Sequence, residues 1–285
     1  MALDMTSARG ARPTIASVLT SDIRFGRADL HVETRAGDGE AEPRAILDRV
    51  ERRDDLDVLA IADRDRLDGA LEARELHAAG EYHFELVPGL QVTTADGPLL
   101  ALWVDVPITA GAPLEETVTA VHAAGGIAVV PHPFARLVRS ISRRALERSL
   151  QSADPAARPD AIQLTSGSAR AEAGARRALE LNASRYHLGE VGASGATFPE
   201  RVATAYTLFP GTLRPGRRAA ELRAAIENGT ARAAAGSRLP IRRLGWRRVA
   251  EQRTREAAHA SRRTLAPLLD RIADARDVMS TGSRR

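Results

Sequence analysis

The sequence predicts an α/β protein built as a barrel or near-barrel. Segments typical of strands alternate with segments typical of helices, and at least six such units fit before residue 230. This alternation favours parallel βαβ units. In such folds the functional site forms at the C-terminal ends of the strands, and polar residues follow most of the predicted strands here. The 285 residues suffice for one large domain with an appendage.

The first predicted strand leads into His31 and Glu33 and then breaks at the glycine-rich turn 37–39. Residues i and i+2 of a strand point the same way. We therefore expect these two side chains to share one face at the end of the strand. Such a position suits a metal or an anion.

The rest of the first half alternates regularly. Pro43 suits the first turn of a helix, and apolar residues at helical spacing follow it. Gly80 suits the end of the next helix. The predicted elements are helix 42–53, strand 58–62, helix 67–79, a strand around 87–91 within 83–94, and strand 99–106.

The second half repeats the same rhythm. Gly125 and Gly126 stop a helix just before a short apolar strand that runs into Pro131 and His132. The predicted elements are helix 114–124, strand 127–130, helix 142–152, a loop at 154–159, strand 161–164, helix 169–183, a strand around 190–191, strand 205–209 and helix 217–227.

The two ends of the chain differ from the barrel. Residues 1–20 are expected to be a disordered lead, residues 21–235 the barrel, and residues 236–285 a basic amphipathic helical tail. From residue 240 onward there are 12 arginines against 5 acidic residues, a net of +7, whereas the whole chain carries +4. Such a tail suits packing on the barrel, self-association, or contact with an acidic partner or nucleic acid.

Composition excludes several chemistries. The sequence contains no cysteine, so thiol nucleophiles and cysteine-ligated zinc are excluded. All 41 basic side chains are arginine, so no Schiff-base or P-loop lysine is present. No run approaches 18 apolar residues, so no membrane span is expected, and a cytoplasmic location follows as the default.

Polar residues converge where the predicted strands end. Because the C-terminal ends of parallel strands meet at one rim, these side chains are expected to lie together. They are His31 and Glu33, Asp63 and Arg64, Gln91, His132, Thr165 and Ser166, and Ser194 and Thr197.

The order of several short motifs resembles the PHP (polymerase and histidinol phosphatase) family, most closely its small bacterial metal-dependent phosphoesterases. The motifs are ADLHVE followed by DG, AIADRD, VPGLQ, AAGGIAVVPHPFAR, GASGAT and AYTLFPG, within residues 28–229. The resemblance implies a distorted (β/α)7 barrel with a C-terminal helical extension in this chain. It also implies a cluster of divalent metals that activates water against a phosphorus centre.

The family's metal ligands carry over only in part. His31, Asp63 and His132 match ligand positions. Five positions differ: Glu33 replaces a histidine, Arg64 a histidine, Gln91 a bridging glutamate, Gly195 an aspartate and Thr197 a histidine. An arginine is always charged and repels a nearby cation by several kcal/mol. The resemblance therefore implies a degenerate metal centre.

The expected function follows from this degeneracy. We expect a catalytically inactive protein that binds a nucleotide or other phosphate compound through Arg64, Arg136 and His132, without a cofactor. One alternative is an active phosphoesterase with a single divalent metal, manganese or zinc, at His31, Glu33 and His132. Another is a scaffold whose basic tail contacts a partner or nucleic acid. Two further interpretations stay open: the two histidines are leftover buried residues, or Arg64 pairs with Asp63, Asp65 or Glu33.

Overall fold

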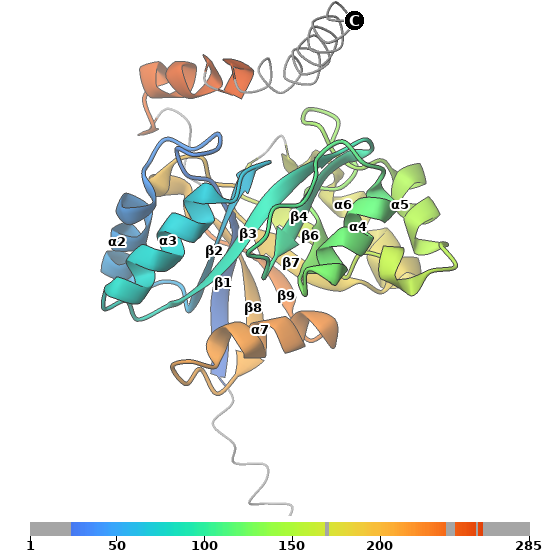
Figure 1. Cartoon of the computed structure of the whole chain (residues 1–285), viewed down its shortest axis with the longest axis horizontal. Coiled ribbons are helices and arrows are strands. Elements are labelled where there is room, and N and C mark those ends of the chain that lie inside the picture. The colour runs from blue at the N-terminus through green and yellow to red at the C-terminus, as the bar shows by residue number, and fades with distance from the viewer. Residues whose placement is uncertain (1–23, 169–170, 238–242, 255, 259–285) are drawn as a thin grey trace, which may run out of the picture.

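The computed structural model describes residues 24–168, 171–237, 243–254 and 256–258 (Figure 1). Within them, nine strands form one sheet. The strands are β1 (Arg24–Val32), β2 (Val58–Arg64), β3 (Glu85–Thr94), β4 (Gly97–Leu102), β5 (Ile127–Val130), β6 (Ala161–Ser166), β7 (Gly189–Ala193), β8 (Ala205–Gly211) and β9 (Arg232–Ala235).

Helices connect most of the strands. The α-helices are α2 (Pro43–Arg53), α3 (Asp68–Ala79), α4 (Leu114–Ala123), α5 (Arg143–Leu150), α6 (Ala175–Leu181) and α7 (Arg218–Glu227). Shorter helical turns are η1 (Pro155–Ala157), η2 (Ala171–Gly174), the π-helical η3 (Asn182–Tyr186) and η4 (Pro199–Arg201). Residues 246–254 and 256–258 are also helical, and we call them the C-terminal helix.

The sheet nearly closes on itself. Its strand order is β7-β6-β5-β4-β3-β2-β1-β8-β9. The chain just beyond the edge strand β7 returns to the end of β1, where the Ala196 N–H donates to the His31 carbonyl at 3.1 Å and the Glu33 N–H donates to the Ala196 carbonyl at 2.9 Å. The predicted α/β barrel is therefore confirmed.

Parallel pairing throughout, which the alternation of elements suggested, is wrong for three strands. β4, β8 and β9 run antiparallel to their neighbours, and β9 has no counterpart in the sequence-based expectation. β3 ends at Thr94 and β4 begins at Gly97. So short a connection closes a hairpin, because a parallel pair needs a crossover of about a dozen residues.

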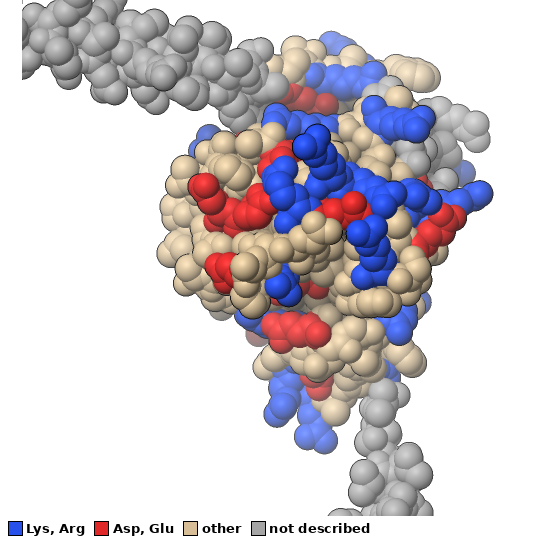
Figure 2. All heavy atoms as spheres, turned by 90° about the vertical axis from the view of Figure 1, so that its right-hand side faces the viewer, with Lys and Arg blue, Asp and Glu red and all other residues tan. Residues whose placement is uncertain are grey.

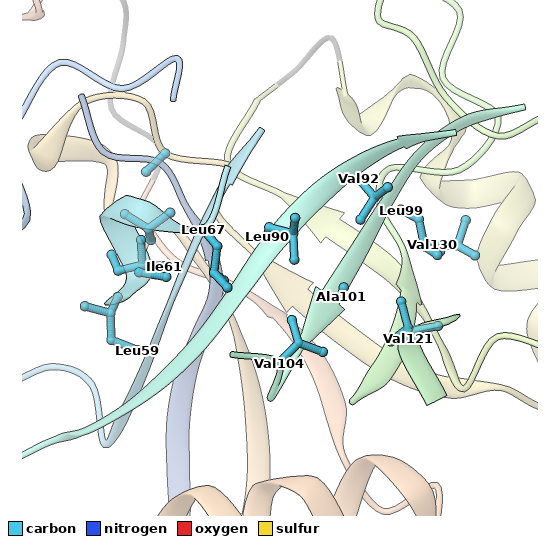
Figure 3. Close-up of a cluster of buried hydrophobic side chains, with 14 of the residues drawn as sticks. Leu59, Ile61, Leu67, Leu90, Val92, Leu99, Ala101, Val104, Val121 and Val130 are labelled. Carbon is cyan, nitrogen blue, oxygen red and sulfur yellow. The ribbon is translucent and has the colours of Figure 1, made fainter. Parts of the chain in front are cut away.

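Side-chain alternation divides the apolar core into two layers. On β2, Leu59 and Ile61 belong to a cluster between the sheet and the helices, part of which Figure 3 shows. The intervening Val58, Ala60 and Ala62 belong to a second cluster inside the barrel. This is the two-residue period of a strand that is buried on both faces.

Helices cover the two ends of the barrel. In Figure 1, α7 lies below the strands, where Leu222, Ala225 and Ile226 join the inner apolar cluster. The C-terminal helix lies across the opposite end, above the ends of the parallel strands. The cavity described below lies at that upper end.

Some expectations fall on residues outside those described. They are the lead 1–20, the start of the helix predicted over 169–183, and the tail beyond residue 258. The described part of that predicted helix is divided into η2, α6 and η3. None of the helices in the described ranges is both long and apolar enough to cross a membrane.

Candidate functional site

A cavity of about 580 Å³ opens between the ends of the strands and the C-terminal helix. Its inner part is lined by five side chains that come from strand ends, which we call the strand-end cluster: His31, Glu33, Arg64, Gln91 and His132. Gly195, Thr197 and Ser166 also line it. The polar residues predicted to converge at one rim therefore largely do so.

A bulge in β1 directs His31 and Glu33 into the cavity. Ala28 and Leu30 face the barrel interior, whereas Val32 packs in the outer layer. The register with β2 shifts between Asp29 and Val32. A bulge changes which residues face inward, so the residues on either side of Val32 point into the cavity.

Asp63 and Arg64 are adjacent on β2 and point to opposite sides. Arg64 lines the cavity, whereas Asp63 lies behind the sheet and does not line it. The Asp63 carboxylate accepts hydrogen bonds from the Thr34 N–H at 2.5 Å and the Thr34 hydroxyl at 2.6 Å. This corrects the expected placement of Asp63 with the metal-position residues, because strand neighbours alternate faces.

Arg64 is held by a carboxylate that the sequence-based pairing did not include. Its Nε donates to the Asp38 carboxylate at 2.8 Å, and the Asp38 side chain is 3% exposed. Burial opposes the charge of Arg64, yet Glu33 and Asp38 raise its pKa above the usual value. The charge of Arg64 is therefore largely balanced within the protein.

Glu33 lies beside His31 and is influenced by the charge of Arg64. Its carboxylate accepts from the Asp38 N–H at 3.1 Å, and it lies 3.8 Å from the His31 Nε2. Burial raises the pKa of Glu33 well above the usual range, although the charge of Arg64 acts in the opposite direction. A carboxyl group with a pKa of about 8 is largely protonated, and therefore neutral, near pH 7.

The two histidines are neutral and have unused ring nitrogens. Both ring nitrogens of His31 and the Nδ1 of His132 are buried without a hydrogen-bond partner, and the two rings stack with centroids 6.3 Å apart. Burial lowers the pKa of His31 to about 3 and that of His132 to about 4. Buried polar atoms without partners are rare, so these nitrogens are available to a ligand.

The remaining predicted positions differ in what they offer. The Gln91 side chain is 1% exposed and its Nε2 has no partner. Gly195 adopts a φ of +59°, which favours glycine, and a Cβ there would lie 3.8 Å from the His31 Nδ1. Thr197 lines the same wall. These residues shape the cavity and provide few charges.

Arg136 does not belong to the cavity. Its side chain is exposed and it is absent from the cavity lining. Arg139, three residues later, lines the cavity instead, as do Arg201 after β7 and Arg253 on the C-terminal helix. Sequence analysis missed these three, which we call the outer arginines, because they lie on loops and on the tail.

The C-terminal helix is attached to the cavity rim by Arg248. This side chain pairs with Glu40 and, at 2.9 Å, with Glu200, and it lies over the Phe198 ring at 5.6 Å. Leu244 and Val249 pack with Phe198 in a small apolar cluster. The helix is therefore part of the cavity wall.

The donor set does not fit a multi-metal centre. Asp63 is engaged by Thr34, and Asp38 is engaged by Arg64. In the described ranges, no group of three or more His, Asp or Glu side chains is placed to hold a metal ion. A fixed cation at Arg64 adds repulsion where a divalent ion would need negative ligands.

The outer surface carries many arginines that are already paired. Figure 2 shows blue side chains gathered on the face that lies at the right of Figure 1, with acidic side chains between them. On and near α5, Arg143 and Arg185 both pair with Glu147, at 2.9 and 3.1 Å, and Arg148 pairs with Glu115 at 2.7 Å. This alternation of charge is poorly suited to a continuous phosphate backbone.

Comparisons with known proteins agree with the fold. No family model matches the sequence. A stretch of 139 residues is 28% identical to the uncharacterized protein MJ1587 of Methanocaldococcus jannaschii, covering 45% of this chain and 80% of that protein. PsfC from Pseudomonas syringae has a similar structure, with a TM-score of 0.56, 18% identity, and coverage of 82% of this chain and 98% of PsfC.

A two-domain protein from Bacteroides vulgatus, described as containing a predicted PHP-like metal-dependent phosphoesterase, superposes with a TM-score of 0.59. The identity is 15%, and the match covers 75% of this chain and 66% of that protein, so it concerns the fold alone. The similarity agrees with the resemblance of the sequence motifs to that family. The fold of this chain is therefore PHP-like.

Proposed function

We propose that this chain binds a phosphate-containing small molecule, such as a nucleotide, in the strand-end cavity and does not hydrolyse it. The observation that carries this proposal is the Arg64–Asp38 ion pair of 2.8 Å inside the cavity. It places a permanent cation where the related motif has a metal ligand, and it engages one of the few nearby carboxylates.

Phosphate chemistry remains the best match for such a cavity. The B. vulgatus protein of the same fold is described as containing a predicted metal-dependent phosphoesterase, and phosphoesters are anionic. Arginine binds phosphate through bidentate charged hydrogen bonds. Replacing metals by arginines would keep the affinity for the anion and remove the ions that activate water.

Neutral groups in the strand-end cluster would complete the recognition. The unpartnered nitrogens of His31, His132 and Gln91 provide donors and acceptors. Because burial lowers the pKa of both histidines, they would contact neutral, polar parts of a ligand. The cluster thus provides directional hydrogen bonds with little net charge.

One alternative has a specific observation in its favour. The His31 Nε2 lies 3.8 Å from the Glu33 carboxylate, and the His132 ring stacks beside it. Two histidines and a carboxylate are ligands that suit zinc. These three side chains are not placed to hold a metal ion in the described structure, so they would have to rearrange around a single zinc or manganese ion to give a reduced phosphoesterase.

Metal content and turnover distinguish the two functions. The protein is dialysed against manganese, zinc and iron in turn, its metal is measured by plasma mass spectrometry, and hydrolysis of p-nitrophenyl phosphate is followed. Substoichiometric metal and no turnover above buffer support the proposal. One metal per chain with turnover, both abolished in His31→Asn and His132→Asn, would establish the alternative instead.

A further inference from the structure

The four arginines that line the cavity differ in how their charge is balanced. Arg64 pairs with Asp38 at 2.8 Å. Among the described residues, no carboxylate pairs with the outer arginines, and the recorded acceptors are the Thr94 carbonyl for Arg139 and the Gly167 carbonyl for Arg201. One carboxylate of the C-terminal helix, Glu256, also lines the cavity, so the outer part has three arginines against one acidic residue and an excess of positive charge.

Arg201 is the most enclosed of the outer arginines. It ends the turn η4, its guanidinium donates to the Gly167 carbonyl, and its Nε is buried without a partner. Burial lowers its pKa, and no charged neighbour opposes that effect. A buried charged donor without an acceptor is costly, and an anion placed beside it removes that cost.

The surroundings of Arg201 combine hydroxyl groups and apolar surface. Ser166 and Ser168 line the cavity on either side of Gly167. Val138, Phe198 and Leu244 contribute apolar surface to the same cavity. Its volume of about 580 Å³ lies within the range of sites for organic ligands and exceeds the needs of a bare phosphate ion.

The ligand chemistry follows from charge and shape together. Three arginines against the single carboxylate of Glu256 leave an excess of positive charge that suits a dianion better than a monoanion. Hydroxyl donors suit the several oxygens of a phosphate. The apolar surface suits an organic body attached to it. The C-terminal helix covers this body and supplies Arg253, so the tail takes part in binding.

We propose that the cavity binds an organic phosphate monoester whose phosphate is held by Arg201, with Ser166 and Ser168 beside it and Arg253 above. This inference rests on the proposed function and moves its anion site from Arg64 to Arg201. The phosphate then lies among the outer arginines, and the strand-end cluster faces the rest of the ligand.

Titration calorimetry with phenyl phosphate, inorganic phosphate and phenol tests this assignment. The full chain is compared with Arg201→Gln, Arg253→Gln and the control Arg177→Gln, an exposed residue outside the cavity that pairs with Glu180 at 3.6 Å. We expect phenyl phosphate to bind more tightly than inorganic phosphate. Arg201→Gln should weaken phenyl phosphate binding about tenfold or more, Arg253→Gln by a smaller factor, and the control should match the original chain.

Four results would overturn the inference. Unchanged binding of phenyl phosphate in both cavity variants would overturn the assignment of the phosphate to Arg201. The proposed function would stand in that case, because the protein would still bind phosphate. Equal affinity for inorganic phosphate and phenyl phosphate would exclude the organic body. Release of phenol by the protein would overturn the proposed function together with the inference. Absence of binding to either phosphate probe would also remove both. Should Arg201→Gln fail to fold, the phenyl phosphate affinity of Arg253→Gln decides the outcome, because Arg253 is exposed and its replacement should not disturb folding.

Discussion

The strand-end cluster and the outer arginines lie in one cavity, yet their charges are arranged in opposite ways. In the cluster, Arg64 is paired with Asp38 and lies beside Glu33, and both histidines are neutral. Among the outer arginines, Arg201 has a buried Nε without a partner. The comparison teaches that in this barrel the arginine at a strand end is mainly a structural cation. In the described part of the cavity wall, positive charge without a carboxylate partner lies on the loops and on the C-terminal helix instead.

The largest expected effect on stability is that of replacing Asp63, which lies directly behind the strand-end cluster. Asp63→Ala should lower the free energy of unfolding by about 3–4 kcal/mol, because it leaves the buried Thr34 N–H and hydroxyl without acceptors. Urea unfolding measures this loss. Asp63→Asn keeps one acceptor oxygen and should cost less. Phenyl phosphate affinity of the folded protein should not change, and a large change would place Asp63 within the site.

The second effect concerns the pH dependence of stability, and it tests whether burial keeps His31 neutral. Burial lowers the pKa of His31 to about 3, whereas in the unfolded chain it titrates near the ordinary histidine value of about 6.5. Between these values the unfolded chain binds the proton more strongly, so this residue reduces stability as the pH falls below 6.5. His31→Asn removes that term, and from pH 7 to pH 4 its stability relative to the original chain should rise by about 3 kcal/mol.

Urea unfolding of both proteins at the two pH values gives this difference directly. Acidic groups with raised pKa, such as Asp29 and Asp63, contribute equally to both proteins and cancel in the comparison. An identical pH dependence in the two proteins would mean that His31 stays accessible to protons in the folded state.

A third change should leave the strand-end cluster with unbalanced positive charge, as among the outer arginines. Asp38→Asn removes the carboxylate that balances Arg64, whose side chain is 28% exposed. Stability should fall by about 2 kcal/mol, less than for a fully buried pair, and inorganic phosphate should bind several-fold more tightly. Thermal unfolding and calorimetry measure the two effects. Asp55→Asn, in the surface pair with Arg53, is the matched control and should change neither.

The smallest effect concerns the attachment of the C-terminal helix. Arg248→Ala removes the pairs with Glu40 and Glu200, which are partly exposed, so the loss of stability should be about 1 kcal/mol. Phenyl phosphate binding should weaken about two- to fivefold as the helix loosens. Arg247→Ala is the control, because Arg247 is 94% exposed and pairs with Glu251 along the helix. Equal effects of the two variants on phenyl phosphate binding would argue against a role of the helix in the cavity.

Much of the strand-end cluster could be predicted from the sequence, for a clear physical reason. Parallel strands end at the same rim, so His31, Gln91 and His132 had to meet there, together with Arg64 and Glu33. The alternation of side chains along a strand also predicts that two neighbouring residues do not both face the cavity. Asp63 and Arg64 are neighbours on β2, so only one of them could face the cavity.

The outer arginines could not be predicted in the same way. Arg201 ends a short helical turn and Arg139 lies in a loop, and neither position has a periodicity that fixes its direction. Arg253 enters the cavity only because Arg248 and the Leu244–Phe198–Val249 contact hold the C-terminal helix against the barrel. Loop conformation, which sequence periodicity does not predict, also brings Asp38 to Arg64 and leaves Arg136 exposed.

Phosphorus NMR spectroscopy of phenyl phosphate mixed with the full chain and zinc tests the central claim of binding without hydrolysis most directly. One spectrum reports binding, through a shift or broadening of the ester resonance, and hydrolysis, through the inorganic phosphate resonance. We predict a shifted ester resonance that persists, with no growth of inorganic phosphate, and loss of the shift in Arg201→Gln. Steady growth of inorganic phosphate that disappears in His31→Asn would contradict the account and establish a working metal site.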